Sequence, residues 1–295
     1  MNRKMKRLLV TGASGFLGWN ICSVARKSWN VFGVAFSTPL EVGGVNIKVV
    51  DLTDSYNLKQ LFLEIEPDAV IHAAAAANTS YCQINQKESY RINVDTSIHI
   101  AGLCMERNIP LVFISTDMVF DGLNAPYKEE DPVCPVNVYG EQKVLAEEEM
   151  IKCYPETTIC RTSIMFGYNP EGSKNWFQKN VESMRMQRDI QLFVDEYRTF
   201  LSVRKAVSGI LLSIGSESGI LHLSGDERVS RYDFARIVTR VFNISNARLT
   251  PYFLREIPVA APRAQDLSMD NNKAKALGFN PSSIEKELEV LSSTT

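Results

Sequence analysis

The chain has 295 residues, of which 45% are hydrophobic and 22% charged, and its formal net charge is −2 at pH 7. These values are ordinary for a globular protein with ample core, and they give no indication of a nucleic-acid partner. No apolar run approaches the roughly 18 residues that a membrane span needs, and the one near the N-terminus stops at Val10, so we expect a cytoplasmic protein.

The first half of the sequence alternates short apolar runs with longer amphipathic ones. Strands are predicted at 7–11, 30–36, 46–52, 68–74, 110–116 and 157–163. Helices are predicted at 16–28, at 55–65 with Asp54 as the cap, at about 88–107, and from about 138 onward. Continuous Val/Ile-rich strands separated by helices are typical of a parallel sheet that is buried on both faces. The sequence therefore predicts an α/β fold with a doubly wound, Rossmann-type parallel sheet.

After Phe166 the pattern becomes less regular. A Gly/Pro-rich loop is predicted at 168–173. Further helices are predicted near 175–187, at 203–214 and from Ser230 to Asn243, and strands at 190–194 and 219–224. We predict a dinucleotide-binding domain over residues 1–165 and a smaller mixed α/β lobe over 166–295, which mainly binds substrate and has segments returning to the first domain.

The stretch TGASGFLG places Gly12, Gly15 and Gly18 directly between the first strand and the first helix. The chain must turn sharply there, let a pyrophosphate approach the backbone, and pack the helix closely on the strand. The helix N-terminus offers free N–H groups and the positive end of its dipole to the phosphates. The expected cofactor loop consists of Gly12, Ser14, Gly15, Phe16, Leu17 and Gly18.

The end of the second strand bears on which dinucleotide binds. An NAD site usually has a carboxylate there, which bonds the ribose 2′-hydroxyl. This chain has Ser37 and Thr38 instead, and no carboxylate before Glu41. Because hydroxyls can donate to a 2′-phosphate, the sequence favours NADP(H), with NAD(H) as the alternative. The six cysteines have no metal-binding spacing, so no metal site is expected.

Three polar side chains follow the fifth strand and open the next helix. Thr116 ends that strand, where the ligands of open α/β folds bind. Tyr139 and Lys143 are one turn apart on the same face of the following helix. A tyrosine hydroxyl can protonate a ketone that accepts hydride, and we expect the Lys143 ammonium and a cationic nicotinamide ring together to lower the tyrosine pKa toward neutrality. Thr116 can hydrogen-bond the same oxygen.

These motifs, with RINVD, DPVCPVNVYG, CRTSIMFG and PRAQDLSMDNNKAKALGF, resemble the extended short-chain dehydrogenase/reductases, and within them the dTDP-4-dehydrorhamnose reductase group. The resemblance covers nearly the whole chain. It implies an NADPH-dependent reductase of a nucleotide-linked 4-keto-6-deoxy sugar, in dTDP-rhamnose biosynthesis, with Thr116, Tyr139 and Lys143 as catalytic residues. It also implies further cofactor contacts from Asp51, Leu52, Ala73, Ala74, Ala75, Asn93, Tyr139 and Lys143.

The substrate side departs from the pattern of that group. Met118 stands where its S-T-D-Y-V-F motif has tyrosine, Ile164 where R-T-S-W has tryptophan, and Arg263 follows Ala261-Pro262 in place of Arg-Pro. The candidate substrate residues are Met118, Asn175, Trp176 and Arg198. Asn175 and Trp176 are equally compatible with a capped helix that anchors the second lobe. Arg198 is either a surface cation or a diphosphate contact.

Other functions stay open. The chain is also similar to the regulatory β subunit of methionine adenosyltransferase, which implies an NAD(P)-binding subunit without turnover and a regulatory partner protein. A nucleotide-sugar epimerase is a further alternative, and so is a homodimer. A 4,6-dehydratase is disfavoured, because such enzymes need Asp-Glu after the threonine and this chain has Asp117-Met118.

Overall fold

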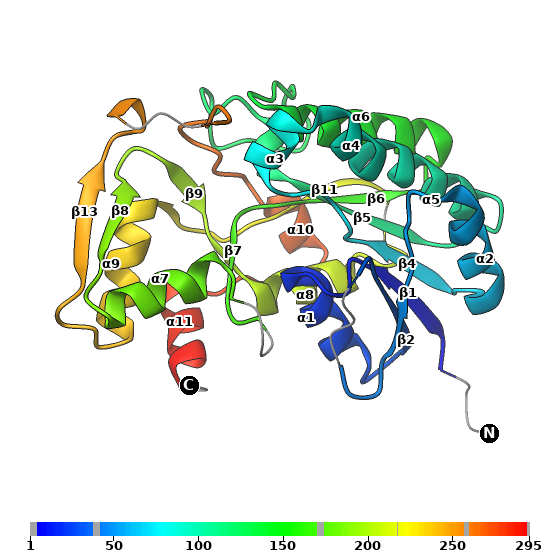
Figure 1. Ribbon diagram of the computed structural model, residues 1–295, viewed down its shortest axis with the longest axis horizontal. Helices are drawn as coiled ribbons and strands as arrows, with labels where there is room; N and C mark the ends of the chain where they lie inside the picture. Colours follow the sequence, from blue (N-terminus) through cyan, green and yellow to red (C-terminus); the bar gives the residue numbers. More distant parts are fainter. Residues whose placement is uncertain (1–4, 38–41, 170–173, 217, 257–259, 294–295) are drawn as a thin grey trace.

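The computed structural model describes residues 5–37, 42–169, 174–216, 218–256 and 260–293. The strands of its central sheet are β1 (Arg7–Thr11), β2 (Asn30–Ala35), β3 (Asn46–Val49), β4 (Ala69–His72), β5 (Leu111–Thr116), β6 (Thr158–Thr162) and β11 (Gly219–Leu223). They are arranged in the order β11-β6-β5-β4-β1-β2-β3, and every neighbouring pair is parallel (Figure 1). The predicted fold class is therefore confirmed.

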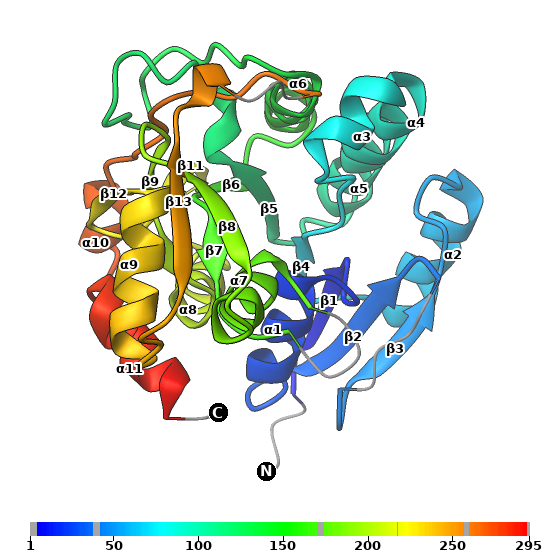
Figure 2. The ribbon, with the colours of Figure 1, turned by 60° about the vertical axis from the view of Figure 1, so that its left-hand side comes forward.

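Helices cover both faces of the sheet. One layer consists of α2 (Ser55–Ile65), α5 (Thr96–Met105) and α6 (Val138–Cys153), and the other of α1 (Phe16–Ala25), α8 (Val203–Leu212) and α10 (Asn272–Ala276). The two layers lie on opposite sides of the strands (Figure 2). Along β1, Leu9 contacts the first layer while Leu8 and Val10 contact the second, as the alternation of a strand requires. Burial on both faces explains why the strands read as continuous apolar runs.

The segment predicted as one helix over about 88–107 is a series of shorter pieces. It contains the end of α4 (Gln86–Tyr90), a π-helical turn at Arg91–Asp95, and α5, and it is preceded by the short helix α3 (Thr79–Ile84). Asn78 caps α3 by accepting a hydrogen bond from the Tyr81 N–H, and Asn85 has a non-helical backbone between α3 and α4. π-helical turns occur frequently at functional sites, and this one carries Asn93.

The second lobe lies beyond one end of the sheet (Figure 1). It contains α7 (Trp176–Arg185), β8 (Asp189–Phe193), β9 (Tyr197–Thr199), β12 (Arg228–Ser230), α9 (Arg231–Val241), β13 (Arg248–Tyr252), a 3-10 turn at Leu254–Glu256 and α11 (Ile284–Ser292). Its core is rich in aromatic rings, among them Phe177, Phe200 and Phe234. Ser230 caps α9 as predicted, by accepting a hydrogen bond from the Asp233 N–H.

The second half of the chain also contributes a helix and a strand to the central sheet and its helix layers. After β7 (Met165–Phe166) and the lobe strands, β10 (Leu201–Ser202) pairs with β7 and leads into α8, which packs on α1. β11 then joins the edge of the central sheet beside β6. No helix within the described ranges has the length and apolar character needed to cross a membrane.

Candidate active site

The loop between β1 and α1 requires glycine at specific positions. Gly12 has a φ of +70°, and a Cβ there would lie 2.8 Å from the Ala74 nitrogen and 2.9 Å from two Ala73 atoms. A Cβ on Gly18 would lie 2.1 Å from the Gly12 oxygen. Gly15 is the N-cap of α1 and offers no side-chain acceptor to the N–H groups of the first turn. This uncapped helix start beside a tight glycine turn fits the pyrophosphate of a dinucleotide.

The other predicted members of this loop differ in burial. Ser14 and Phe16 are half-buried, whereas the Leu17 side chain is 9% exposed and lies in the core beneath the sheet. Leu17 can therefore contribute only its backbone to a cofactor site.

Buried hydrogen bonds join this loop to the end of β4. The Thr11 hydroxyl lies 2.7 Å from His72 Nδ1, and the Ala73 and Ala74 N–H groups donate to Thr11 Oγ1 at 3.1 Å each. On its other side, His72 Nε2 lies 3.0 Å from the Ser97 hydroxyl. Burial, assisted by the charge of Lys143, lowers the pKa of His72 to about 3, so the ring is neutral. His72 and Thr11 thus fix the turn that holds the predicted cofactor residues Ala73 and Ala74, with Ala75 half-buried beside them.

Asn93 is fully engaged with the protein itself. It is buried, it accepts a hydrogen bond from the Ala76 N–H at 2.8 Å, and it donates to the Ala76 oxygen at 3.2 Å and to Gln142 Oε1 at 2.9 Å. Gln142 lies on α6 between Tyr139 and Lys143 and donates onward to Ser89 Oγ at 2.9 Å. Asn93 therefore connects the loop after β4 to the helix that carries the predicted catalytic pair.

The residues predicted near the adenosine half lie at the ends of the next strands. Ser37 is exposed just after β2, while Thr38 lies outside the described residues. Asp51 is exposed after β3, and its carboxylate accepts hydrogen bonds from the N–H and the hydroxyl of Thr53 at 2.9 and 2.8 Å. Leu52 is half-buried against the core.

The start of α6, which carries Tyr139, packs closely on the turn that follows Thr116 at the end of β5. That turn is a 3-10 segment at Asp117–Val119, and a Cβ on Gly140 would lie 2.3 Å from the Met118 oxygen. The Thr116 hydroxyl donates to Asp117 Oδ1 at 3.2 Å. Asn137 caps α6 by accepting a hydrogen bond from the Gly140 N–H at 3.0 Å, which fixes where the helix begins.

Burial has the largest effect on the pKa values of both Tyr139 and Lys143. The pKa of Tyr139 is raised, by burial first and then by Cys82 and Asp117. Burial lowers the pKa of Lys143 to about 7, although Glu147 acts in the opposite direction. Its Nζ donates to the Ile114 oxygen at 2.7 Å and lies 3.7 Å from the centre of the Phe113 ring. Burial thus sets the direction of the tyrosine pKa in this structure, where Lys143 bonds a backbone carbonyl. The expected lowering, which involved a cationic nicotinamide ring as well as Lys143, stays a prediction.

A buried ion pair joins α6 to the sheet, and no local sequence pattern indicates it. Glu147 belongs to a run of three glutamates, which is typical of a solvated helix face, yet its side chain is 4% exposed. Its carboxylate accepts hydrogen bonds from Arg161 on β6, at 2.7 Å from Nη2, and from the Ser115 hydroxyl. The pair ties the helix of Tyr139 to two strands of the sheet. No cluster of His, Cys, Asp or Glu suited to a metal occurs in the part of the chain that the structure describes.

Two of the substrate candidates have mainly structural contacts. Asn175 caps α7 in a capping box with Gln178 and donates to the Gly167 oxygen at 3.0 Å. Trp176 donates from Nε1 to the Met165 oxygen at 3.0 Å, and its ring lines a pocket of about 170 Å³ between α7 and α9. The capped-helix interpretation thus accounts for Asn175, while Trp176 also faces a pocket.

The other two substrate candidates lie near the end of β5. Met118 is half-buried and lines a small cavity with Arg198 and Asn137. Arg198 is not a surface cation: its side chain is 4% exposed and donates to Glu196 at 2.9 Å, with Nε 3.8 Å from Asp117. Glu196 also pairs with Arg231 and Arg263. Of this cluster, the sequence singled out Arg198 and Arg263 but not Glu196 or Arg231.

Comparisons with known proteins agree with this architecture. A family model described as the RmlD substrate binding domain matches residues 5–294. The methionine adenosyltransferase 2 subunit beta of Pongo abelii is 26% identical over 288 residues, which cover 95% of this chain and 84% of the relative.

Two solved structures are similar over their whole length. The dTDP-4-dehydrorhamnose reductase of Bacillus anthracis str. Ames in complex with NADP has a TM-score of 0.86 at 24% identity, covering 99% of this chain and 100% of that chain. A hypothetical dTDP-4-dehydrorhamnose reductase from Sulfolobus tokodaii has a TM-score of 0.82 at 30% identity, covering 95% of this chain and 98% of that chain. The resemblance inferred from the motifs is confirmed, and the chain belongs to the RmlD substrate binding domain family.

Proposed function

We propose that the protein is an NADPH-dependent reductase of a nucleotide-linked 4-keto-6-deoxy sugar, in the manner of dTDP-4-dehydrorhamnose reductases. One observation carries this proposal: the start of α6, which carries Tyr139, packs on the turn that follows Thr116 at the carboxyl end of β5. The glycine turn at Gly12 follows β1, which is separated from β5 by β4 alone, and the parallel strands bring it to the same edge of the sheet. A carbonyl placed there is within reach of a proton donor and of a bound dinucleotide.

The residues of this chain supply the proton and hold the carbonyl. A reduced nicotinamide supplies hydride to C4 when it is bound. Tyr139 carries its proton at neutral pH, as an ordinary tyrosine does, so its hydroxyl can donate to the developing alkoxide. The Thr116 hydroxyl turns from Asp117 to donate to the same oxygen. Lys143 leaves the Ile114 carbonyl and stabilises the tyrosinate that remains after proton transfer.

NADPH is the proposed cofactor, since Ser37 stands exposed at the end of β2 where an NAD site usually has a carboxylate. The Bacillus anthracis structure, in complex with NADP, supports this assignment. NADPH should therefore bind more tightly than NADH in a fluorescence titration. A Ser37→Asp change should shift the preference toward NADH, because its carboxylate repels the 2′-phosphate. Tighter binding of NADH by the parent protein would overturn the assignment.

The test of the activity is a panel of nucleotide-linked 4-keto-6-deoxy sugars, with the dTDP derivative first, in the presence of NADPH. Reduction is followed by the loss of the absorbance of the reduced cofactor. dTDP-glucose with NAD serves as the control for dehydratase activity, and we expect no 4-keto product because Met118 cannot exchange protons. A parent protein that binds NADPH but reduces none of the sugars would contradict the proposal.

A regulatory subunit is the second candidate function. It is favoured by the position of Lys143, which bonds the Ile114 carbonyl and lies over Phe113, and by the similarity to a methionine adenosyltransferase subunit over 95% of this chain. On this alternative the dinucleotide site is kept for binding and a synthetase-like partner copurifies with the protein. Recovery of such a partner by affinity purification from the native host, together with no reduction of any sugar in the panel, would support this alternative.

A further inference from the structure

Two pockets meet at one ion pair in the space between the sheet edge and the second lobe. The larger one, of about 170 Å³, lies between α7 and α9 and is lined by the aromatic rings of Trp176, Phe193 and Phe234. The smaller one, of about 30 Å³, lies against Met118, two residues after Thr116. Glu196 and Arg263 line both pockets. These two residues therefore separate the catalytic edge from the aromatic pocket.

Glu196 is a buried carboxylate surrounded by guanidinium groups. Its side chain is 0% exposed. The carboxylate accepts hydrogen bonds from Nη2 of Arg263 at 2.8 and 2.9 Å, from Nη2 of Arg198 at 2.9 Å and from Nη2 of Arg231 at 3.4 Å. The three arginines outweigh the cost of burial and lower the pKa of Glu196, so it is ionised at neutral pH. Its backbone lies in the link between β8 and β9, outside either strand.

The positive charge around Glu196 is not fully compensated. Among the residues that the structure describes, Asp117 is the one further carboxylate paired with these three guanidinium groups, 3.8 Å from Arg198. Arg231 Nε is buried and finds no hydrogen-bond acceptor among the described residues. The Arg263 side chain is 34% exposed. Donors with spare capacity that converge on one point suit a phosphate group, to which arginine can bind with two parallel hydrogen bonds.

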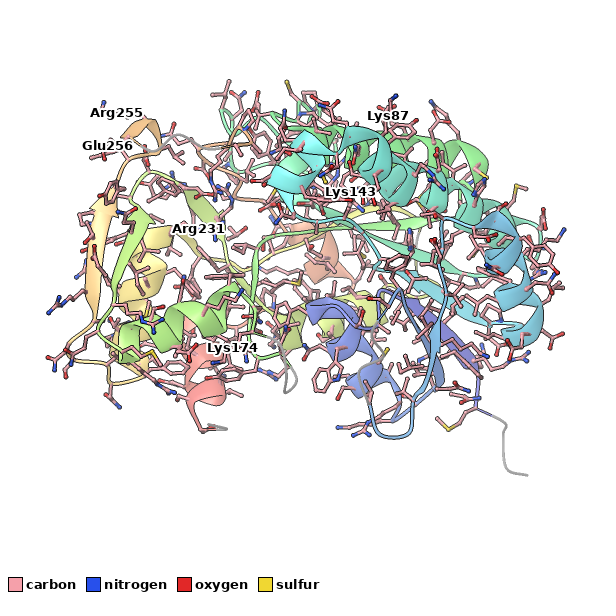
Figure 3. The ribbon with its side chains drawn as sticks, in the orientation of Figure 1. Lys87, Lys143, Lys174, Arg231, Arg255 and Glu256 are labelled. Carbon is pink, nitrogen blue, oxygen red and sulfur yellow. The ribbon has the colours of Figure 1, made fainter. Side chains whose placement is uncertain are left out.

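Aromatic rings hold two of these arginines in place and form the remainder of the larger pocket. The Arg231 guanidinium carbon lies 5.6 Å from the Trp176 ring centre, and that of Arg263 lies 5.4 Å from the Phe193 ring centre. Arg231 belongs to α9 in the second lobe, whereas Lys143 belongs to α6 beside the sheet (Figure 3). A pocket lined partly by aromatic rings beside converging cations suits a nucleoside diphosphate.

We infer that the carboxylate of Glu196 occupies the anion position of this arginine cluster, and that a nucleoside diphosphate must displace it in order to bind. The inference rests on the proposed function, in which the sugar reaches Tyr139. The cavity at Met118 is far smaller than the several hundred Å³ of typical ligand sites, so the sugar cannot enter while Glu196 and Arg263 are paired. Opening this contact joins the two pockets. Glu196 is an internal competitor that sets the affinity for the diphosphate.

The experiment compares dTDP binding by the parent, by Glu196→Gln and by Asp266→Asn, using isothermal titration calorimetry. Asp266 pairs with Arg228 at 2.5 Å in the same lobe, so its variant removes the same charge outside the cluster. Removal of the competitor should tighten dTDP binding about 10-fold or more. The control should change the affinity by less than about 2-fold. Glu196→Gln should also lower the melting temperature of the free protein. Addition of dTDP should raise the melting temperature of this variant by more than it raises that of the parent.

Unchanged or weaker dTDP binding by a folded Glu196→Gln protein would overturn the inference, as would equal tightening by the control. If Glu196→Gln fails to fold, Arg263→Gln tests the same site from its exposed rim, and dTDP affinity should fall about 10-fold. An unchanged affinity in Arg263→Gln would overturn the inference as well. The proposed reductase activity is tested separately by sugar turnover. If no sugar is reduced while the dTDP affinities are as expected, the result rejects the activity and leaves the inference about Glu196 standing.

Discussion

Tyr139 lies at the start of α6, on the turn after β5, and burial, Cys82 and Asp117 raise the pKa of its phenol, which is protonated at neutral pH. Tyr139→Phe removes one oxygen and keeps the ring packing, so folding and NADPH affinity should change little. Turnover of the keto sugar should fall by about 10² to 10⁴, the range expected for loss of a general acid. Single-turnover kinetics and an NADPH titration on the same preparation measure both quantities.

The matched control is Tyr56→Phe on α2, where the side chain is 69% exposed. It should leave rate and affinity unchanged. Turnover by Tyr139→Phe at nearly the parent rate would show that another group donates the proton.

Lys143 should show a trade-off between stability and function. Its pKa is lowered to about 7 in the folded protein from an ordinary 10.5, so between these pH values the unfolded chain binds more protons and the parent becomes more stable as pH rises. Lys143→Met removes this dependence. Its stability relative to the parent should therefore be greater at pH 6 than at pH 9, by ~1–3 kcal/mol. NADPH affinity and turnover should both fall.

Urea denaturation of the parent and Lys143→Met at the two pH values measures this difference. A stability difference that does not vary with pH would show that Lys143 keeps its proton throughout this range.

At the scale of single residues, the sequence predicted which side chains carry the proposed chemistry but not how the charged ones are compensated. The glycine turn and the Tyr139–Lys143 pair are local patterns. Glu147 pairs with Arg161, and Glu196 with Arg263. Each of these acids looks like a surface residue in its own segment, because its partner is on a different element. The direction of the Tyr139 pKa also depended on burial, which its segment does not reveal.

At the scale of elements, the position of α6 depends on Gly140. An alanine Cβ there would lie 2.3 Å from the Met118 oxygen and 2.8 Å from the Pro135 Cβ, so the helix must move away from the turn after Thr116. Gly140→Ala should destabilise the fold by ~1–3 kcal/mol and reduce turnover. Gly102→Ala on α5 is the control, since its Cβ would meet only the Cys153 sulfur, at 3.9 Å. That change should stabilise by ~0.5–1 kcal/mol, as an ordinary helical Gly→Ala change does.

Thermal unfolding of both variants, with turnover measured in parallel, tests this pair. Equal stability of Gly140→Ala and the parent would show that α6 tolerates displacement.

Elements with strong local signals were predicted closely, and those that depend on distant partners were not. The helix at 55–65 and its Asp54 cap agree with α2, because the cap and the apolar spacing lie in the same segment. β13 was missed: it contains Pro251 and pairs only with β8, about 60 residues earlier. The segment over 88–107 has helical periodicity throughout, which conceals the π-helical turn at 91–95.

At the scale of the whole molecule, the chain leaves the sheet after β6 and returns to it. The strand at 219–224 was predicted, but its place beside β6 in the central sheet was not, since local patterning carries no information on that pairing. The core on that face combines Leu8 and Val10 with Val207 and Leu223. The order of the other six strands follows from the doubly wound pattern.

This shared core leads to a prediction about the fragment 1–165. Without α8, α10 and β11, one face of its sheet loses much of its cover, so the fragment should not unfold cooperatively on its own. Urea denaturation followed by circular dichroism, with the complete chain as the reference, measures this. A sharp transition in the fragment would instead show that residues 1–165 form an autonomous domain.

The hydrogen bonds around His72 determine where its proton lies. Ser97 donates its only hydroxyl proton to the Asn93 oxygen at 2.7 Å, so His72 Nε2 must donate to Ser97 and Nδ1 must accept from Thr11. A ring with one fixed tautomer and a pKa of about 3 keeps the same form across the physiological range. Its nitrogen resonances in an NMR spectrum should be insensitive to pH and sensitive to the Thr11 contact. The NMR signals of this imidazole therefore report whether the contact between the glycine turn and the loop after β4 is formed.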